Sequence, residues 1–202
     1  MEITVRSAEG PEVRELARVL GEAFADDPVI GWLIRDERVR ARRAAHMFGA
    51  LVRHQFIGLG AVDAAFDETG SMVGAAVWSP PGDRKPSTAA ELRALPGLAR
   101  AFRTRLLVAG QLAQRMQAEH PTEPHWYLAF VGTLPSVRGR GVAHALLGPR
   151  IEQCDATGVP AYLESSKREN IPYYERYGFD RTGELDVTAG GPPVWPMWRA
   201  PR

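Results

Sequence analysis

The stretch VRGRGVAHALL, residues 137–147, places two glycines and two arginines immediately before an apolar run. It follows PTEPHWYLAFVGTLP, residues 121–135, whose aromatic and branched side chains predict a strand, while its own apolar residues continue at helical spacing. A glycine-rich turn between a strand and a helix leaves backbone N–H groups unpaired at the positive end of the helix dipole, which suits a phosphate. It equally suits a chain that only has to turn sharply, so the rest of the sequence must decide.

The turn differs from two common glycine-rich loops. Gly139 and Gly141 permit positive φ angles and close approach of a ligand to the backbone, and the arginines beside them add cationic donors. A P-loop needs Gly-Lys followed by Ser or Thr, but here Val142 and Ala143 follow Gly141. A dinucleotide-binding turn needs a third small residue in another register and an acidic residue about 20 positions later. Neither pattern is convincing.

The composition predicts one domain spanning residues 1–202, with 45% hydrophobic and 24% charged residues, as in ordinary globular proteins. A net charge of +1 and a pI of about 8.0 provide no global field for nucleic acid or an anionic membrane, so any anion site is local. Cys154 is the one cysteine, which excludes an internal disulfide and a cysteine-based zinc site. The first residues lack a signal-peptide core and no apolar run approaches ~18 residues, so we expect a cytoplasmic protein.

Hydrophobic spacing along the chain predicts a mixed α/β order without repeats or linkers. The predicted strands are 2–8, 61–67, 71–80, 121–135, 161–166, 179–187 and 192–200. The first predicted helix begins near Pro11 and ends at about residue 26, and the second contains residues 44–52. One long helix is predicted at about 89–118, and two more cover 143–154 and 170–178. We expect Pro149 to kink the helix after the glycine-rich turn, since its ring removes a backbone donor.

The residues Arg138, Gly141 and Ala143 fit the pattern Gln/Arg-x-x-Gly-x-Gly/Ala, and on this basis the chain resembles the Gcn5-related N-acetyltransferase superfamily. VGTLPSVRGRGVAHALL, residues 131–147, is similar to the superfamily's strand, proline, glycine-rich loop and helix. NIPYYERYGF, residues 170–179, is similar to its later Asn, Tyr and Gly-Phe signature.

Further segments resemble puromycin N-acetyltransferase and its actinobacterial relatives, from the first strand to the last. These segments are GEAFADDP (21–28), EPHWYLAFVG (123–132), VPAYLESSKRENIPYYERYGF (159–179) and GPPVWPMWR (191–199). Similarity of this kind supports fold and reaction more closely than substrate.

The resemblance implies a single-domain, mixed α/β acyltransferase fold: a central twisted, mostly antiparallel sheet with a splayed parallel pair of strands and flanking helices. Its coenzyme-binding core would span about 123–182. It also implies acetyl-coenzyme A as cosubstrate and transfer to a primary amine of a small molecule, such as an aminonucleoside or another antibiotic-like amine. We expect no metal, because the sequence has no His, Cys and acidic cluster at ligand spacing, and direct transfer, because Cys154 is a poor candidate for an acyl-enzyme. We expect a monomer or homodimer with no nucleic-acid or membrane partner.

The resemblance also assigns the coenzyme-binding residues. The strand before the loop would bulge, which frees backbone groups at Val131 and Thr133, and one of these amides would serve as the oxyanion donor. The pyrophosphate would lie on the amides of residues 138–143. Asn170 matches the asparagine that helps to hold the coenzyme, and its position also suits a helix N-cap. The predicted set is Val131, Thr133, Arg138, Gly139, Arg140, Gly141, Val142, Ala143 and Asn170.

Two residues are candidates for proton transfer. Tyr174 matches the tyrosine that the family places against the thioester sulfur, where a phenol of pKa ~10 can donate to a thiolate of pKa ~8.5. Glu164, at the end of its strand, is a candidate base for an acceptor ammonium of pKa ~10. Without the resemblance, Tyr174 would read as a packed aromatic residue, and Glu164 can equally be a strand-end residue that hydrogen-bonds a loop.

Weaker hypotheses concern residues that could line an acceptor pocket or form an acyl-enzyme. Trp78 and Trp195, at strand ends, are candidate walls of an acceptor pocket, although core packing is the more usual role of tryptophan. Asp27, like its neighbour Asp26, lies where relatives line the acceptor cleft, and it would attract a cation. Cys154 falls on an apolar helix face, which disfavours a cysteine acyl-enzyme.

Three other functions remain as alternatives. The first is acetylation of protein N-termini or lysines, which would favour an open groove. The second is a non-catalytic acyl-coenzyme A sensor, which the presence of both Tyr174 and Glu164 does not favour. The third is binding of nucleic acid through RGRG, which would predict a clustered basic surface and a pI above ~9.

Overall fold

The computed structural model of the chain describes residues 2–82, 86–186 and 190–202. It contains a seven-stranded sheet in the order β1-β2-β3-β4-β5-β7-β6, in which β4 and β5 are parallel and all other neighbours are antiparallel. This confirms the expected mixed sheet with one parallel pair. The strands are β1 (Thr4–Ser7), β2 (Val62–Phe66), β3 (Met72–Ser79), β4 (Trp126–Thr133), β5 (Ala161–Ser165), β6 (Asp180–Arg181) and β7 (Trp195–Arg199).

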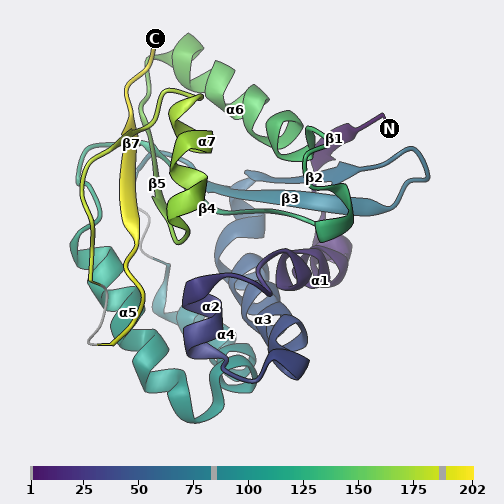
Figure 1. Ribbon diagram of the computed structural model, residues 1–202, viewed down its shortest axis with the longest axis vertical. Helices are drawn as coiled ribbons and strands as arrows, with labels where there is room; N and C mark the ends of the chain where they lie inside the picture. Colours follow the sequence, from purple (N-terminus) through teal and green to yellow (C-terminus); the bar gives the residue numbers. More distant parts are fainter. Residues whose placement is uncertain (1, 83–85, 187–189) are drawn as a thin grey trace.

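Helices cover both faces of this sheet (Figure 1). Two hydrophobic clusters hold the layers together: one is formed with α1 to α5, and the other with α6 and α7. The helices are α1 (Val13–Ala23), α2 (Pro28–Leu33), α3 (Glu37–Leu51), α4 (Thr88–Phe102), α5 (Leu106–Ala118), α6 (Val142–Thr157) and α7 (Ile171–Glu175). The side chains of Asp27, Asp36 and Ser87 cap the N-termini of α2, α3 and α4.

The prediction of one long helix at 89–118 is wrong. The segment forms α4 and α5, separated by a short turn at Arg103–Arg105. Arg103 has a φ of 51° and a ψ of −120°, outside the helical region, and Arg43 donates to the carbonyl oxygen of Ala101 at 2.7 Å. No glycine or proline marks the break, and the helical spacing of apolar residues continues across it.

The strand expected at 179–187 is only partly formed, and the kink expected at Pro149 stays a prediction. Within the expected strand 179–187, β6 covers Asp180–Arg181, and a single bridge joins Leu185 to Val194; residue 187 lies outside the described residues. The helix after the glycine-rich turn runs without interruption from Val142 to Thr157 and contains Pro149.

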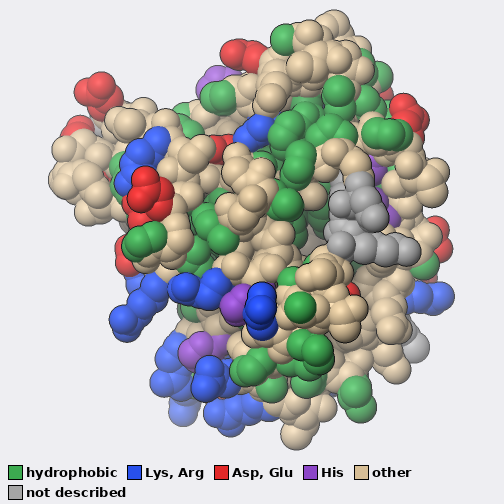
Figure 2. Space-filling view, turned by 180° about the vertical axis from the view of Figure 1, so that it is seen from behind, with side chains coloured by type: hydrophobic (Ala, Val, Ile, Leu, Met, Phe, Trp, Pro, Cys, Tyr) green, Lys and Arg blue, Asp and Glu red, His purple; other side chains and the backbone are tan. Residues whose placement is uncertain are grey.

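The charged side chains are unevenly spread over the surface. On the face seen in Figure 2, Lys and Arg side chains gather at the lower left, whereas Asp and Glu side chains are scattered over the rest. In the part of the chain that the structure describes, no helix has the length and apolarity needed to cross a membrane. The described residues also contain no group of three or more His, Cys, Asp or Glu side chains placed to hold a metal ion.

The crossing of α1 over α3 depends on Gly21. A Cβ atom at this position would clash with the carbonyl oxygen of Ala41 and lie 3.0 Å from the amide nitrogen of Ala45. Gly21→Ala should therefore lower the free energy of unfolding by ~1–3 kcal/mol, measured by urea denaturation. Gly148→Ala in α6 is the matched control, because its Cβ meets nothing within 4 Å. It should be neutral or slightly stabilising through helix propensity. Equal stability of the two variants would contradict tight packing at Gly21.

Candidate active site

The parallel strands β4 and β5 pair over only three residues each. Trp126–Leu128 lie opposite Ala161–Leu163, and beyond Leu128 strand β4 continues to Thr133 without β5 beside it. A bulge begins at this point: Leu128 faces Trp78 and Phe130 faces Val77, so Ala129 is an extra residue in β4. The two strands therefore separate along one side of β4.

The bulge determines which backbone groups face the gap. The N–H group of Leu134 donates to the carbonyl of Val73 in β3 at 2.8 Å. Because backbone groups alternate sides along a strand, Gly132 also faces β3, whereas the N–H and C=O groups of Val131 and Thr133 point toward the open edge. These are the two positions at which free backbone groups were expected, and their role stays a prediction.

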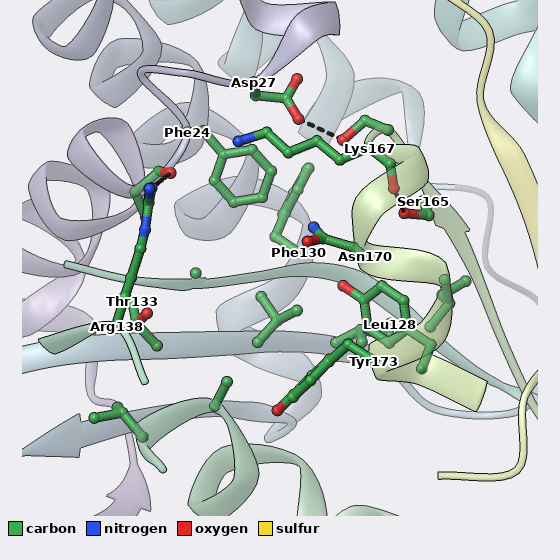
Figure 3. A pocket seen from close by; sticks show the side chains of 18 of the residues that line it. Phe24, Asp27, Leu128, Phe130, Thr133, Arg138, Ser165, Lys167, Asn170 and Tyr173 are labelled. Carbon is green, nitrogen blue, oxygen red and sulfur yellow. Dashed lines mark hydrogen bonds between the residues drawn. The ribbon is translucent and has the colours of Figure 1, made fainter. Parts of the chain in front are cut away.

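A cavity of about 580 Å³ fills the gap between the two strands (Figure 3). It extends from the glycine-rich loop before α6, along β4, to the loop after β5 and the end of α1. It brings together most of the site residues predicted from the sequence: Asp27, Val131, Thr133, Arg138, Gly139, Gly141, Val142, Ala143, Glu164, Asn170 and Tyr174. Arg140, Trp78 and Trp195 do not line it.

The glycine-rich loop adopts the conformation that its sequence requires. Gly139 and Gly141 have φ angles of 77° and 81°, and Gly141 is the N-cap of α6. A Cβ atom at either glycine would meet no described atom within 4 Å, so the loop leaves open space above its backbone. The unpaired N–H groups of the first turn of α6 lie beside this space and favour an anion.

Arg138 and Lys167 extend toward the end of α1 from opposite sides of the cavity (Figure 3). Arg138 donates to the carboxylate of Asp26 at 3.0 and 3.2 Å and to the carbonyl of Ala23 at 3.1 Å. Lys167 Nζ lies 2.8 Å from Asp26 Oδ1. Partial burial acts to raise the pKa of Asp26, but the hydrogen bonds from Arg138 and Lys167 outweigh it and lower the pKa to about 2. Asp26 therefore holds both cations beside the cavity.

Asp27 is a carboxylate in the cavity wall and is only 4% exposed. Its Oδ1 accepts from the backbone N–H of Ile30 at 2.9 Å, and its Oδ2 accepts from the hydroxyl of Ser166. Burial raises the pKa of Asp27, and these hydrogen bonds only partly oppose the rise. A buried carboxylate in this position favours a cationic group in the cavity.

Glu164 lies near the end of β5 and lines the same cavity, with its side chain only 2% exposed. Its Oε1 has no hydrogen-bond partner among the described residues, and Nδ1 of His120 is 3.6 Å away. An unsatisfied buried carboxylate oxygen is costly for stability, and such groups concentrate at functional sites.

Tyr174 lines the cavity from α7 and packs against Tyr173 and Phe179. Burial raises the pKa of its phenol, and the nearby charge of Asp27 raises it further. The phenol therefore remains protonated at neutral pH, as a proton donor must.

The other predicted residues occupy different environments. Asn170 lines the cavity and makes no capping hydrogen bond through its side chain. Trp78 is fully buried in the core on the α6 side of the sheet, and Trp195 packs there too while its Nε1 donates to Glu184 at 3.0 Å. Arg140 is exposed to solvent. Cys154 is buried, and this burial raises the pKa of its thiol to about 11, so it is a poor nucleophile at neutral pH.

Four residues at or near this site were not predicted from the sequence. Ser166 and Lys167 directly follow the strand that carries Glu164, and their position at its carboxyl end was the available signal. His120 and His125 lie in the segment before β4, and each is next to a proline, Pro121 or Pro124, which was the only signal in the sequence. Their contacts depend on the tertiary fold.

Comparison with known proteins identifies similar sequences and structures. The Acetyltransferase (GNAT) family matches residues 15–179. An uncharacterized N-acetyltransferase of Schizosaccharomyces pombe is 28% identical over 190 residues, covering 88% of this chain and 74% of the relative.

Solved structures are similar over the full chain. The crystal structure of histone acetyltransferase HPA2 and related acetyltransferase from Corynebacterium glutamicum is 29% identical, with a TM-score of 0.75, and covers 100% of this chain and 98% of that one. The PaiA N-acetyltransferase of Thermoplasma acidophilum in complex with coenzyme A is 12% identical, with a TM-score of 0.62 and 99% coverage of each chain. The second likeness concerns the fold alone.

Proposed function

The chain belongs to the GNAT family of acetyltransferases, and from this premise we propose that it moves the acetyl group of acetyl-coenzyme A directly onto a primary amine of a small molecule. Its enzyme class, an N-acetyltransferase, follows from the family and its relatives. The donor, the acceptor and the residue roles belong to the proposal. The observation that carries it is the continuous cavity, which joins a glycine-rich helix N-terminus to two buried carboxylates along the open edge of β4.

The residues present fit acetyl-coenzyme A. Gly139 and Gly141 leave an open cradle that a Cβ atom would enter, and the N-terminus of α6 supplies N–H donors there. Apolar side chains between the cradle and the carboxylates, among them Leu128 and Phe130, suit the uncharged arm of the coenzyme. When bound, the coenzyme supplies an acetyl group activated as a thioester.

Different groups of the chain would then stabilise the oxyanion, deprotonate the acceptor and protonate the sulfur. The open-edge N–H group of Val131 is suited to stabilise negative charge on the carbonyl oxygen of the acetyl group. Glu164 is the proposed base that removes a proton from the acceptor ammonium, and Tyr174 is the proposed acid that protonates the sulfur. Because Cys154 is buried, outside the cavity lining and largely protonated, transfer proceeds in a ternary complex rather than through an acyl-enzyme.

The charge and shape of the cavity support a small, cationic acceptor. Asp27 and Glu164 both line it, whereas the aromatic rings of Phe24 and Phe130 narrow its other walls. Two carboxylates among apolar walls favour an alkyl ammonium group carried on an apolar body. An aminonucleoside or another antibiotic-like amine remains one acceptor within the proposal, on the strength of the sequence resemblance.

A second candidate acceptor is a protein lysine or N-terminus. The observation that favours it is the 29% identity to a chain described as histone acetyltransferase HPA2 and related acetyltransferase. That description belongs to the other protein, and because of it lysine peptides must be tested beside small amines as acceptors.

The function is tested by release of coenzyme A thiol in a screen of amines. The panel contains aminonucleosides, alkyl and arylalkyl amines, polyamines and lysine peptides, with and without a chelator. We expect turnover with at least one small amine, at equal rates in chelator. Turnover with peptides alone would replace the small-molecule acceptor. Tight coenzyme binding without turnover of any amine would identify a sensor, and loss of activity in chelator would refute the metal-free reaction.

A further inference from the structure

A cluster of histidine and tyrosine side chains lies behind Glu164. Along β5, Ala161 and Leu163 pack in the core on the α6 side of the sheet, so Tyr162 and Glu164 point to the opposite face. The ring of His120, which follows α5, lies 4.8 Å from the ring of Tyr162 and 5.0 Å from that of His125, just before β4. His125 is almost fully buried.

A line of polar contacts runs through this cluster from the cavity wall. Nδ1 of His120 lies 3.6 Å from Oε1 of Glu164, and Nε2 of His120 lies 3.1 Å from Nε2 of His125. Nδ1 of His125 lies 2.5 Å from the backbone carbonyl oxygen of Glu123.

The carbonyl oxygen at the end of this line fixes where the protons are. A carbonyl only accepts, so Nδ1 of His125 carries a hydrogen and, in a neutral ring, its Nε2 accepts. Nε2 of His120 then donates, and Nδ1 of His120 presents its lone pair to Glu164. If the pair takes up one more proton, an N–H group at His120 Nδ1 faces the carboxylate. The two rings therefore have a place for one further proton, and that place faces Glu164.

We propose that the His120–His125 pair receives the proton that Glu164 takes from the acceptor amine. The inference rests on the proposed function. The ammonium gives one proton to the Glu164 carboxylate, and Glu164 passes it to His120 Nδ1, which forms an imidazolium and restores the carboxylate. The neutral amine nitrogen bonds to the acetyl carbon, the carbon–sulfur bond breaks, and the sulfur takes a proton from Tyr174. The nitrogen loses its second proton to water as the amide forms, and Tyr174 takes one proton back from water, which restores its phenol.

Burial explains why a relay is useful. The side chain of Glu164 is 2% exposed, whereas that of His120 is 11% exposed, so His120 has better access to solvent. His120 then returns its proton to water while the buried Glu164 is ready for another cycle. His120 acts through Glu164 and does not itself line the cavity.

Several titratable groups surround the pair among the described residues. Glu164 and Tyr162 face it from β5, Tyr127 faces it from β4, and Glu119 precedes His120 in the chain. Burial raises the pKa of the Tyr162 phenol, and the charge of Glu164 raises it further, so Tyr162 stays protonated. Tyr162 therefore does not compete with Glu164 or His120 for charge at neutral pH.

The test compares His120→Asn, Glu164→Gln and the double variant with the wild type, using an amine that the wild type acetylates. At pH 7 we expect His120→Asn to lower kcat/KM by ~10-fold or more, which is less than the ~100-fold or greater loss typical of a base that contacts substrate. The deficit should shrink as the pH rises toward the amine's own pKa of ~10, where the acceptor is already neutral. His46→Asn, on the exposed surface of α3, is the control and should retain wild-type rates.

The double variant separates a relay from a structural role. If His120 acts only through Glu164, the double variant should be no slower than Glu164→Gln alone. Losses that multiply, or a His120→Asn deficit that is the same at every pH, would overturn the relay. A wild type that turns over no amine would instead refute the proposed function.

A spectroscopic measurement keeps the inference testable even if a variant fails to fold. In the wild-type protein, ¹⁵N NMR of the neutral rings should place the hydrogen of His125 on Nδ1 and that of His120 on Nε2. A neutral His120 protonated at Nδ1 would have no lone pair facing Glu164, and this result would overturn the proposal.

Discussion

Tyr174→Phe is expected to lower kcat by at least ~100-fold at pH 7, the lower end of the range for general acid catalysis. The substitution removes one hydroxyl group and retains the ring, which packs between Tyr173 and Phe179. Coenzyme affinity should barely change, because the phenol interacts strongly with the sulfur only as charge develops there. The measurement is steady-state acetyl transfer together with coenzyme binding by titration calorimetry.

Tyr177→Phe is the matched control for this experiment. Tyr177 carries a hydroxyl group that bonds His144 at 2.9 Å and Tyr173 at 3.0 Å, but it does not line the cavity. It should retain most of its activity. A solvent proton can partly replace the lost acid, so the Tyr174→Phe deficit should decrease at low pH. Full turnover of Tyr174→Phe at neutral pH would show that the phenol only packs and that another group protonates the sulfur.

Gly141→Val is expected to weaken coenzyme binding by ~100-fold or more while the fold survives. A valine at a φ of 81° costs ~1–3 kcal/mol of backbone strain, and relief of that strain would move the N–H groups at the start of α6. Its side chain would also enter the open cradle, where the protein itself offers no clash within 4 Å. Titration calorimetry with coenzyme A measures the loss, and circular dichroism checks the fold.

Gly158→Val is the control that distinguishes loss of the coenzyme-binding cradle in Gly141→Val from the effect of backbone strain alone. Gly158 caps the other end of the same helix at a φ of 66° and lies outside the cavity lining. A Cβ atom at Gly158 would also meet no described atom within 4 Å. Its variant should lose similar stability and keep wild-type coenzyme affinity. Unchanged affinity in Gly141→Val, or equal losses of affinity in both variants, would contradict the assignment of the loop.

Local sequence patterns were sufficient where one short segment determines the geometry. The glycines at 139 and 141 predicted positive φ angles before a helix, and both have them. Two short apolar runs that flank the turn-prone ETG, residues 68–70, predicted the strands at 61–67 and 71–80, and these form β2 and β3, which pair antiparallel. The resemblance of the loop and of residues 170–179 to a known superfamily then supplied the mostly antiparallel sheet and the splayed pair, which no local pattern contains.

Features that depend on tertiary contacts were not predictable. The break at Arg103 coincides with a positive φ angle and with a hydrogen bond from Arg43, 58 positions before the Ala101 carbonyl that accepts it, so periodicity alone could not detect it. Trp78 sits near the end of a strand, as expected, but its ring points into the core instead of the cavity. The proximity of His120 to Glu164 requires α5, β4 and β5 to meet, and a single sequence does not contain that information.

The short ladder between β4 and β5 has a mechanical consequence. The sheet divides into two plates, β1 to β4 and β5 to β7, which meet at a joint of only three residue pairs. A molecule lodged between the plates acts as a brace across that joint. Any brace that binds only the folded chain contributes RT ln(1 + [L]/Kd), about 2.7 kcal/mol at a hundredfold excess over Kd. Under the proposed function, a rising concentration of acetyl-coenzyme A is expected to stabilise the folded chain by this amount.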